Sequence, residues 1–380
     1  MRDMADFQIP LLALVITMTS TLALAGQSPS SQPTLRQIAG PRLLIGGAIM
    51  AADLEDPKVA QLIATELSTV TGGNEFKPDF LQREKGTFTF ERADKIIAFA
   101  QQHDIKVVGH TLCWHQQTPA WMFQKPDKSP LSREEALDNL KTHIETVMKH
   151  FKGKVIGWDV VNEGIADDPK QYIRDTPARR AIGDDFIIQA FKLAHAADPD
   201  VELYYNDYNI DAPYKRDRAL RLVRDLKAAG VRLDAVGIQG HWLLNSPPAS
   251  EVDDAITAFA KEGVKVMITE MDVDVLPRKA AGADISATEK AGFDPYKNGI
   301  PAGVLQAQGK RYGELFKVFM KHRSDITRIT LWGIDDGRSW LNNFPVRGRT
   351  NYPMLWDREL HPKPAYEAVR KELLSASTEG

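Results

Sequence analysis

The chain has 380 residues, of which 43% are hydrophobic and 26% are charged, so it can bury a large hydrophobic core. Its 48 basic and 51 acidic residues leave a formal net charge of −3. The sequence shows no basic stripe, and this balance argues against a nucleic acid as partner.

The N-terminus has the pattern of a secretory signal peptide. Residues Pro10 to Ala25 are apolar or small, and Ala23-Leu24-Ala25 before Gly26 fits an A-x-A cleavage site. A retained membrane anchor is the alternative, but an apolar run of about 15 residues is short for a stable span. The sequence therefore predicts a signal peptide over residues 1–25 and a secreted or periplasmic protein with no membrane contact after cleavage.

Two further features follow from composition. Residues 26–42 are rich in Ser, Pro and Gln and are expected to form a flexible lead-in. Cys113 is the single cysteine, so no disulfide can form within the chain. Because Cys113 lies between Leu112 and Trp114, we expect a buried, unreactive thiol.

From residue 43 onward, apolar segments alternate with amphipathic ones. The segments expected to be strands are RLLIGGAI, the run ending in NEFK, IKVVGHTLCW, KVIGWDVVNE, VELYYNDYN, LDAVGIQGH, VKVMITEMDV and TRITLWGID. Among the helices expected between them are Asp56 to Val70, Glu91 to His103, Arg133 to Phe151, Lys215 to Ala229 and Leu305 to His322. Gly153, Gly230 and Gly263 follow predicted helices and are expected to end them.

This alternation predicts a parallel α/β fold. Eight strand–helix units fit a closed (β/α)8 TIM barrel that forms a single catalytic domain over residues 43–376. An open doubly wound sheet is the alternative, but the first predicted strand is not followed by the G-x-G-x-x-G phosphate-binding pattern. The stretch from Leu276 to Gly303 is long for a plain connection and is expected to overhang the cleft.

Two glutamates stand within apolar strand-like segments, Glu163 in GWDVVNE and Glu270 in VMITEMDV. Both acids come near the carboxyl ends of predicted strands, the end at which an α/β barrel places its active site. One such acid could simply cap the next helix. Two carboxylates that face one cleft are, however, the usual machinery for cleaving a glycosidic bond.

The surroundings of each glutamate suggest different roles. A general acid needs a raised pKa at neutral pH, and we expect a nearby charge, that of Glu270, or apolar walls to raise the pKa of Glu163. A nucleophile must stay ionised. His241 in GIQGH and Asp272, two residues beyond Glu270, can form a Glu270–His241–Asp272 chain that keeps the nucleophile charged.

Further polar and aromatic clusters follow other predicted strands. Sugars need both flat rings and hydrogen-bond donors, because their C–H faces stack on rings and their hydroxyls bind polar groups. Two histidines, His110 and His115, also raise the possibility of zinc, but their spacing does not place both on one helix face. The residues in these clusters are Asn74, Lys77, His110, Trp114, His115, Trp121, Asn206, Asp207, Tyr208, Trp332 and Trp340.

Taken together, these motifs resemble glycoside hydrolase family ten, the barrel-type endo-1,4-β-xylanases. GHTLCWH, WDVVNE, NDYN, GIQGH, ITEMDV and WGIDD–SW occur in the family's order between Leu43 and Leu374. The resemblance implies that Glu163 is the general acid/base and Glu270 the nucleophile. It implies supporting roles for Asn162, His241, Asp272 and Gln239, and substrate binding by Asn74, Lys77, His110, Trp114, Tyr208, Trp332 and Trp340.

One motif departs from the family pattern. Where the family commonly has E-N-x-M-K, this chain has G-N-E-F-K, so that Gly73 replaces a carboxylate and Phe76 a methionine. In the family this carboxylate usually binds the sugar two sites from the point of cleavage. We therefore expect weaker binding at that subsite, with the catalytic assignment unchanged.

The expected function is hydrolysis of internal β-1,4 bonds in xylan and xylo-oligosaccharides with retention of configuration. No metal or organic cofactor is implied, and a monomer is expected. A related retaining β-1,4-glucanase of the cellulase type is the nearest alternative. A catalytically silent carbohydrate-binding barrel has no need of an acid and nucleophile pair, and a metal-dependent hydrolase is the third alternative.

Overall fold

The computed structural model describes residues 32–276, 284 and 294–378. The described residues from Thr34 onward form one compact unit. The expected signal peptide and most of the long connection after Leu276 lie outside the described residues. None of the described helices is both long and apolar enough to span a membrane.

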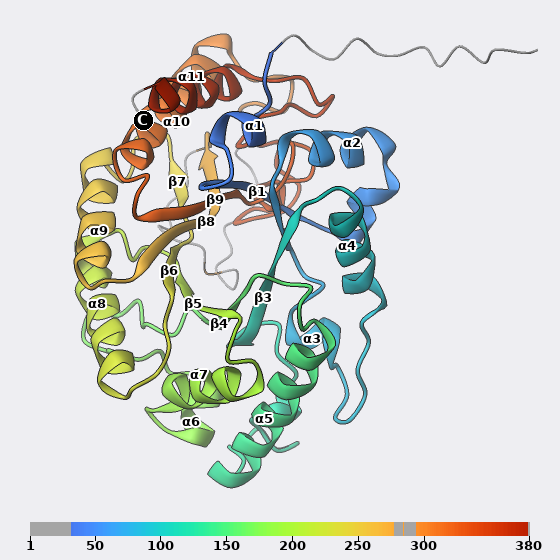
Figure 1. The fold of residues 1–380 in the computed structure, drawn as a ribbon, viewed down its shortest axis with the longest axis vertical. Helices are drawn as coiled ribbons and strands as arrows, with labels where there is room; N and C mark the ends of the chain where they lie inside the picture. Colours follow the sequence, from blue (N-terminus) through green and yellow to red (C-terminus); the bar gives the residue numbers. More distant parts are fainter. Residues whose placement is uncertain (1–31, 277–283, 285–293, 379–380) are drawn as a thin grey trace, which may run out of the picture. The chain divides into compact units, whose positions relative to one another are not determined.

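The strands form a closed parallel barrel, as the sequence predicts. In Figure 1 they lie at the centre, and the helices surround them. The sheet order is β6-β5-β4-β3-β2-β1-β9-β8-β7, and pairing of β6 with β8 closes the ring. The strands are β1 (Leu44–Ile49), β2 (Thr69–Gly72), β3 (Lys106–Trp114), β4 (Gly157–Asn162), β5 (Glu202–Asp207), β6 (Ala235–Ile238), β7 (His241–Leu243), β8 (Lys265–Asp274) and β9 (Ile326–Leu331).

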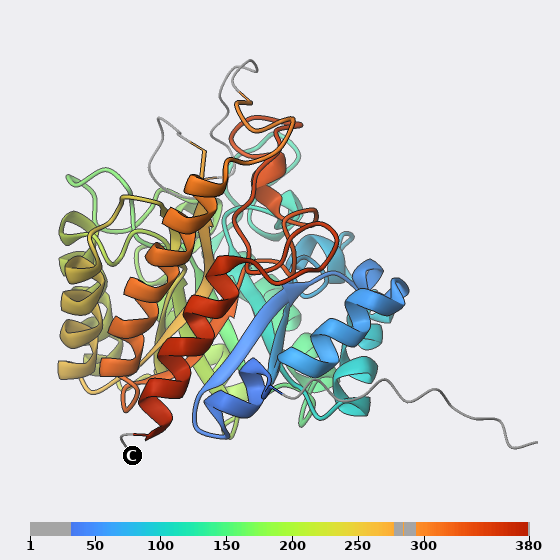
Figure 2. The same cartoon turned by 90° about the horizontal axis from the view of Figure 1, so that it is seen from above.

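The helices lie outside the ring and cover the strands. In Figure 2, α10 and α11 lie side by side, and Gly309 on α10 allows this because a Cβ there would come 3.1 Å from Pro364. The α-helices are α1 (Leu35–Ala39), α2 (Pro57–Glu66), α3 (Pro78–Leu81), α4 (Glu91–Gln102), α5 (Arg133–His150), α6 (Pro177–Ile182), α7 (Phe186–Ala197), α8 (Pro213–Ala228), α9 (Ala249–Lys261), α10 (Ala302–Lys321) and α11 (Pro364–Thr378). Short 3-10 helices are η1 (Ala51–Glu55), η2 (Ala120–Met122) and η3 (Trp340–Asn342).

Two predicted boundaries need correction. The lead-in was expected to reach residue 42, but α1 begins at Leu35, and burial of Leu35 and Ile38 fixes this helix on the barrel. The helix expected over Asp56 to Val70 ends at Glu66, because the chain becomes extended at Leu67 and β2 begins at Thr69. Short polar and apolar stretches at element ends carry little periodic signal, which explains both errors.

The glycines expected to end helices do so. Gly153, Gly230 and Gly263 have φ values of 73°, 67° and 71°. This left-handed backbone is costly for residues with a Cβ and satisfies the carbonyls at a helix end. Each of these glycines therefore directs the chain from a helix into the strand that follows.

The hydrophobic core has two parts. A large cluster lies between the strands and the surrounding helices. A second cluster joins Val108, Tyr204, Ala235 and Met267 from four different strands, so these side chains point into the ring. Arg328 is buried beside them, and its guanidinium donates to Thr71 Oγ1 at 3.2 Å. The barrel interior is therefore packed by side chains.

The predicted sixth strand is divided in the structure. β6 ends at Ile238, Gly240 takes a φ of 82°, and β7 begins at His241. β7 pairs with the end of β8, and the register places His241 opposite Asp272. The break therefore brings together two residues that the sequence analysis paired.

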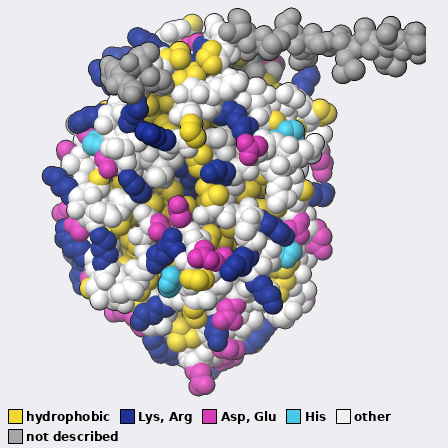
Figure 3. Space-filling model, viewed as in Figure 1, with side chains coloured by type: hydrophobic (Ala, Val, Ile, Leu, Met, Phe, Trp, Pro, Cys, Tyr) yellow, Lys and Arg dark blue, Asp and Glu magenta, His cyan; other side chains and the backbone are white. Residues whose placement is uncertain are grey.

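On the face drawn in Figure 3, basic and acidic side chains are interspersed. Neither sign forms a continuous stripe on this face.

Candidate active site

A cavity of about 220 Å³ opens at the carboxyl ends of the barrel strands. Both glutamates and most of the predicted binding residues line it. The lining residues are Ala48, Ile49, Met50, Asp53, Gly73, Asn74, Lys77, His110, Trp114, Gln117, Asn162, Glu163, Gln239, His241, Glu270, Trp332, Gly333, Arg338 and Trp340.

Glu163 is the first residue after β4 and is 3% exposed. Its φ of 57° directs the chain away from the strand and its carboxyl group into the cavity. Trp114 Nε1 donates to Oε2 at 2.8 Å, while Gln239 Nε2 and Asn162 Nδ2 donate to Oε1 at 3.0 and 3.2 Å. The carboxyl group is therefore held from three neighbouring parts of the barrel.

The electrostatic environment suits Glu163 to the role of general acid. Burial, followed by the negative charge of Asp207, raises the pKa of Glu163 to about 7. The sequence analysis predicted this direction and named Glu270 as the charge responsible. Glu270 does contribute, but its effect on the pKa is smaller than that of Asp207. A carboxyl group with this pKa can carry a proton near neutral pH.

Glu270 lies within β8 rather than at its end, because the strand continues to Asp274. Asn206 Nδ2 donates to its Oε1 at 2.7 Å, and His241 Nε2 lies 3.2 Å from Oε2. Burial raises the pKa of Glu270, but the hydrogen bond from His241, the charges of His110 and His241 and the hydrogen bond from Asn206 together outweigh it, and the pKa is lowered overall. Glu270 therefore remains an anion where Glu163 is protonated.

His241 links Glu270 to a second carboxylate. Its Nδ1 lies 3.0 Å from Asp272 Oδ2, which also accepts a 2.7 Å hydrogen bond from Trp340 Nε1. Burial lowers the pKa of His241, but Asp272 and Glu270 raise it overall to about 9. The predicted Glu270–His241–Asp272 chain is thus present, with a positively charged imidazole at its centre.

Amide side chains connect the two glutamates. Asn206 Nδ2 donates to Asn162 Oδ1 at 3.0 Å as well as to Glu270. Gln239 Nε2 lies 3.2 Å from the same Asn162 oxygen and donates to Glu163. The carboxyl groups therefore share one hydrogen-bond network, with Glu163 and Glu270 at its two ends.

Polar residues from the loops that follow β2 and β3 line another side of the cavity. Lys77 Nζ donates to Asn74 Oδ1 at 3.1 Å and to Gln117 Oε1 at 2.7 Å. Lys77 also lies 5.0 Å from the centre of the Trp114 ring. Burial lowers the pKa of Lys77 to about 8. Asn74, Lys77 and Trp114, which the sequence analysis predicted to bind substrate, therefore lie together in the cavity wall.

The loop after β9 supplies the aromatic side. Trp332 and Trp340 line the cavity and are both partly exposed. The ring of His110 lies 5.3 Å from that of Trp332, and the ring of His241 lies 4.9 Å from that of Trp340. The two tryptophans therefore offer flat surfaces beside the catalytic groups, as the sequence indicates.

The histidines considered as zinc ligands have other contacts. His110 Nδ1 lies 2.9 Å from Asp159 Oδ2, and His115 Nδ1 lies 4.0 Å from Glu163 Oε2. In the described part of the chain, one group of potential metal ligands occurs, Asp357, Glu359 and His361. It does not line the cavity.

Tyr208 is a predicted binding residue that the structure places elsewhere. Its side chain is buried, does not line the cavity, and makes hydrogen bonds with Asp167 and Arg174. Asn206 from the same motif is the residue that contacts Glu270. Gly237 on the neighbouring strand makes room for it, since a Cβ there would lie 2.4 Å from Asn206 Oδ1.

Gln117, Asp53 and Arg338 also line the cavity without having been identified in the sequence analysis. Arg338 Nε lies 3.3 Å from Asp53 Oδ1, so an ion pair forms part of the cavity wall. The sequence around these three residues does not indicate that they line a cavity, because a polar residue in a loop is usually exposed to solvent. Only the contact between η1 and the loop after β9 brings the pair together.

At Gly73 the missing side chain leaves a space that Met50 fills. A Cβ on Gly73 would lie 2.9 Å from Met50 Sδ, and Asn74 Nδ2 lies 3.6 Å from the same sulfur. Glu75 does not replace the lost carboxylate, because it is buried and accepts hydrogen bonds from Ala51 N and Arg92. This part of the cavity therefore has a thioether where the pattern of related sequences predicts an anion.

The cysteine expected to be inert is buried on β3. Burial raises the pKa of Cys113 to about 12. The thiol is therefore protonated at physiological pH and has no role in the chemistry of the cavity.

Several known proteins are similar to this chain. A sequence model described as glycosyl hydrolase family 10 matches residues 34–372. Endo-1,4-beta-xylanase A from Xylanibacter ruminicola is 39% identical over 377 residues, which cover 98% of this chain and 99% of that protein. Endo-1,4-beta-xylanase B from Paenibacillus barcinonensis is 40% identical over 322 residues, or 85% of this chain and 93% of that protein.

Solved structures give the same result. A GH10 endoxylanase retrieved from a sugarcane soil metagenome has a TM-score of 0.84 and 36% identity, covering 90% of this chain and 100% of that one. Xylanase XynB from Paenibacillus barcinonensis, solved with a conduramine derivative, has a TM-score of 0.82 and 38% identity, covering 90% of this chain and 99% of that one.

Proposed function

The chain belongs to glycosyl hydrolase family 10, and we propose that it is a retaining endo-1,4-β-xylanase. It hydrolyses internal β-1,4-xylosidic bonds of xylan and of xylo-oligosaccharides. The observation that carries this proposal is the contrast between two carboxyl groups in one cavity. Burial and Asp207 raise the pKa of Glu163 to about 7, whereas hydrogen bonds lower the pKa of Glu270.

The contrast fits a double displacement. In the first step, Glu270 attacks the anomeric carbon while Glu163 gives its proton to the departing glycosidic oxygen. This forms a covalent glycosyl-enzyme through Glu270. In the second step, Glu163 takes a proton from water, which attacks the same carbon and releases Glu270. Two inversions restore the original β configuration.

The remaining lining residues suit a sugar chain. Asn74, Lys77 and His110 offer polar groups to hydroxyls, and Trp332 and Trp340 offer ring faces for stacking. Asn162 lies beside Glu163 and can reach a hydroxyl of the sugar that is attacked. None of these residues requires a bound metal for its proposed role, and activity is expected to survive a chelator.

The experiment that tests the function compares substrates. Purified protein is incubated with linear xylan, with xylo-oligosaccharides and with soluble cellulose, and the new reducing ends and the product lengths are measured. We expect short xylo-oligosaccharides from xylan and little release from cellulose. A Glu270→Gln variant purified in parallel controls for contaminating host enzymes. Equal release from cellulose and xylan would instead support the glucanase alternative.

We also propose that the protein is exported and acts as a monomer. The apolar segment from Pro10 to Ala25 and the small residues before Gly26 support export. Expression of the full chain should give a mature N-terminus at Gly26, which N-terminal sequencing reads directly. Light scattering should give the mass of one mature chain.

A further inference from the structure

The turn that carries the general acid/base has an unusual backbone. Glu163 takes a φ of 57°, a left-handed conformation that is unfavourable for a residue with a Cβ. Its N–H still continues the sheet by donating to Asn206 O at 2.9 Å. The change of direction therefore begins at Glu163 itself. The peptide groups that follow leave the sheet, so they need hydrogen-bond partners other than the neighbouring strand.

Arg174 holds the first of these groups. Its Nε donates to the main-chain oxygen of Glu163 at 2.9 Å. The main-chain N–H of Arg174 donates to Gly164 O at 2.8 Å, so the two segments of the loop are joined twice. Arg174 thus contacts the backbone of the catalytic residue and leaves the carboxyl group free to face the cavity.

Tyr205 and Asp207 on β5 hold the next two groups. Tyr205 Oη accepts hydrogen bonds from Gly164 N and Ile165 N, both at 3.0 Å. Asp207 Oδ2 accepts from Tyr205 Oη at 2.5 Å and from Ile165 N at 3.3 Å. Side chains from β5 therefore hold the N–H groups of Gly164 and Ile165. The main-chain oxygen of Gly164 is held by the N–H of Arg174.

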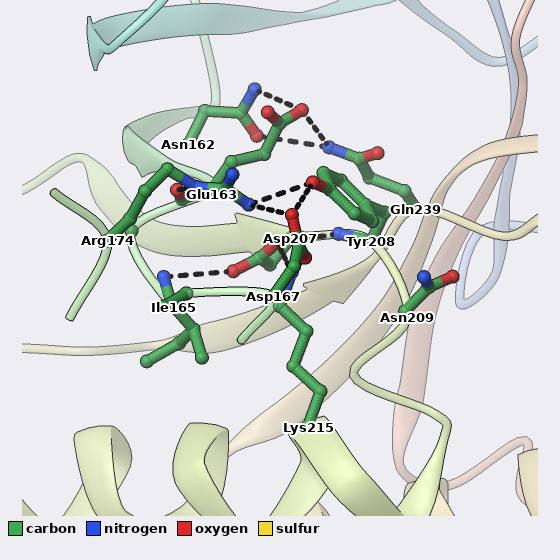
Figure 4. Close-up of polar contacts among 12 residues, drawn as sticks. Asn162, Glu163, Ile165, Asp167, Arg174, Asp207, Tyr208, Asn209, Lys215 and Gln239 are labelled. Carbon is green, nitrogen blue, oxygen red and sulfur yellow. Dashed lines mark hydrogen bonds and ion pairs between the residues drawn. The ribbon is translucent and has the colours of Figure 1, made fainter. Parts of the chain in front are cut away.

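Arg174 is itself fixed by a cluster of charges (Figure 4). Its guanidinium donates to Tyr208 Oη at 2.8 Å and lies 3.0 Å from Asp167 Oδ2. Lys215 Nζ lies 3.0 Å from Asp167 and 2.8 Å from Asp207, and 3.8 Å above the Tyr208 ring. We call Asp167, Arg174, Asp207, Tyr208 and Lys215 the Arg174 cluster.

The charges of the Arg174 cluster balance. Two carboxylates face one guanidinium and one ammonium, and the side chains of Lys215 and Asp207 are both 0% exposed. Buried charges of this kind are tolerated when they are paired and hydrogen-bonded, and removal of one partner leaves the other unpaired. Loss of Arg174 therefore removes a donor from Glu163 O and also loosens the residues beside it.

We propose that Arg174 is a positioning residue for Glu163 and that the Arg174 cluster fixes the acid/base turn in its left-handed conformation. This role rests on the proposed glycosidase function. A fixed turn keeps the Glu163 carboxyl group within reach of the glycosidic oxygen in the first step and of water in the second. Proton transfer of this kind contributes about 100-fold to 10,000-fold to the rate. If the turn is loosened, part of this rate contribution from proton transfer is lost, whereas attack by Glu270 on the anomeric carbon is unaffected.

The test uses a pair of substrates that differ in their need for an acid. Departure of xylose oxygen from xylan requires protonation, whereas dinitrophenolate leaves without it. For Arg174→Gln, we expect kcat/KM on linear xylan to fall about 10-fold to 100-fold, which is part of the roughly 100-fold to 10,000-fold that general acid catalysis contributes. On dinitrophenyl β-xylobioside, kcat/KM should change less than about 3-fold.

Two further variants make the test specific. Arg174→Lys keeps the positive charge but has no fork to reach both Glu163 O and Asp167, so it should show the same split between substrates. Arg180→Gln is the matched control, because Arg180 on α6 pairs with the exposed Asp175 and does not touch the turn. It should behave as the wild type on both substrates.

Three outcomes would overturn the proposal. One is an equal loss on both substrates by a folded Arg174→Gln protein, which a general structural role would produce. Another is unchanged kinetics on xylan. The third is full activity of Arg174→Lys, which would mean that charge alone matters. If Arg174→Gln does not fold, the Lys variant decides. Failure of the proposed function itself is distinct, because the wild type would then not hydrolyse xylan.

Discussion

The two glutamates proposed as the catalytic pair stand in different kinds of backbone. Glu270 lies inside β8, where its N–H donates to Gln239 O at 2.7 Å and the strand continues on both sides. Glu163 lies just beyond the end of β4, in a left-handed turn that side chains hold. The sheet thus positions the nucleophile, which must approach one carbon along one line. A turn carries the acid/base, which must serve a leaving oxygen and then a water.

The side-chain environments differ in the same way. Glu270 has a charged imidazole of His241 beside it, and hydrogen bonds keep its pKa below the ordinary value. Glu163 has Trp114 and amide donors beside it, and burial raises its pKa to about 7. One hydrogen-bond network therefore keeps Glu270 ionised and lets Glu163 carry a proton. Substitutions of Glu270 and of Glu163 should consequently change activity in different ways.

The largest expected effect is loss of the nucleophile. Glu270→Ala cannot form the covalent intermediate, so turnover should fall by on the order of a million-fold on every substrate, as when other covalent hydrolases lose their nucleophile. Steady-state rates on xylan and on dinitrophenyl β-xylobioside measure this. Substantial residual activity on either substrate would assign the nucleophile to another group.

Loss of the acid/base should depend on the substrate. Glu163→Ala should lower kcat/KM on xylan by about 100-fold to 10,000-fold, because the leaving oxygen is no longer protonated. On dinitrophenyl β-xylobioside, kcat/KM should stay near the wild-type value, although the second step becomes slow and a burst of dinitrophenolate appears. Equal losses of kcat/KM on both substrates would contradict the assignment of Glu163 as the acid/base.

The pH dependence of kcat/KM should reflect the ionisation of both Glu163 and Glu270. Glu163 must be protonated in the first step, so kcat/KM on xylan should fall about tenfold per pH unit above its pKa of about 7. Glu270 must be ionised, and its lowered pKa places the acidic decline below pH 4.5. On dinitrophenyl β-xylobioside, kcat/KM should keep the acidic decline and lose the alkaline one. An alkaline decline of equal size on both substrates would contradict the assignment of Glu163.

The smallest effect concerns Gly73, away from the catalytic pair. The φ of Gly73 is not positive, so the backbone accepts a residue with a side chain. A Cβ at this position would lie 2.9 Å from Met50 Sδ, so the Met50 side chain must move to make room for it. A charge-assisted hydrogen bond from Gly73→Glu should favour short xylo-oligosaccharides by up to about 1–3 kcal/mol in kcat/KM, less the cost of moving Met50. Gly73→Glu combined with Met50→Ala removes that cost.

The matched control for this test is Gly73→Gln, which has the same size without the charge. It should give a smaller gain than Gly73→Glu. If both variants leave short-substrate kinetics unchanged in the Met50→Ala background, the missing carboxylate does not limit binding at this subsite.

Much of the fold and of the site could be predicted because strand ends carry a strong signal. Runs such as VMITEMDV are buried on both faces, and a parallel barrel brings all their carboxyl ends to one mouth. Glu163, Glu270, His241 and Asp272 meet in the structure for that reason.

Residues beyond the strand ends were harder to predict. The pleat defines side-chain direction up to Asp207, the end of β5, but not for Tyr208, which turns into the Arg174 cluster. Asn206 reaches Glu270 through space that Gly237 leaves open on β6. Its role depends on a residue about thirty positions away in a neighbouring strand, which periodicity in one segment does not reveal.

The central claim is that Glu163 and Glu270 act by double displacement, and the anomeric configuration of the first product tests it most directly. Proton NMR recorded within the first minutes of xylo-oligosaccharide hydrolysis, before mutarotation, separates the two anomers. The account predicts that the β anomer appears first and the α anomer grows in later. An α anomer that appears first would show a single inverting displacement and would contradict the assignment of Glu270 as nucleophile.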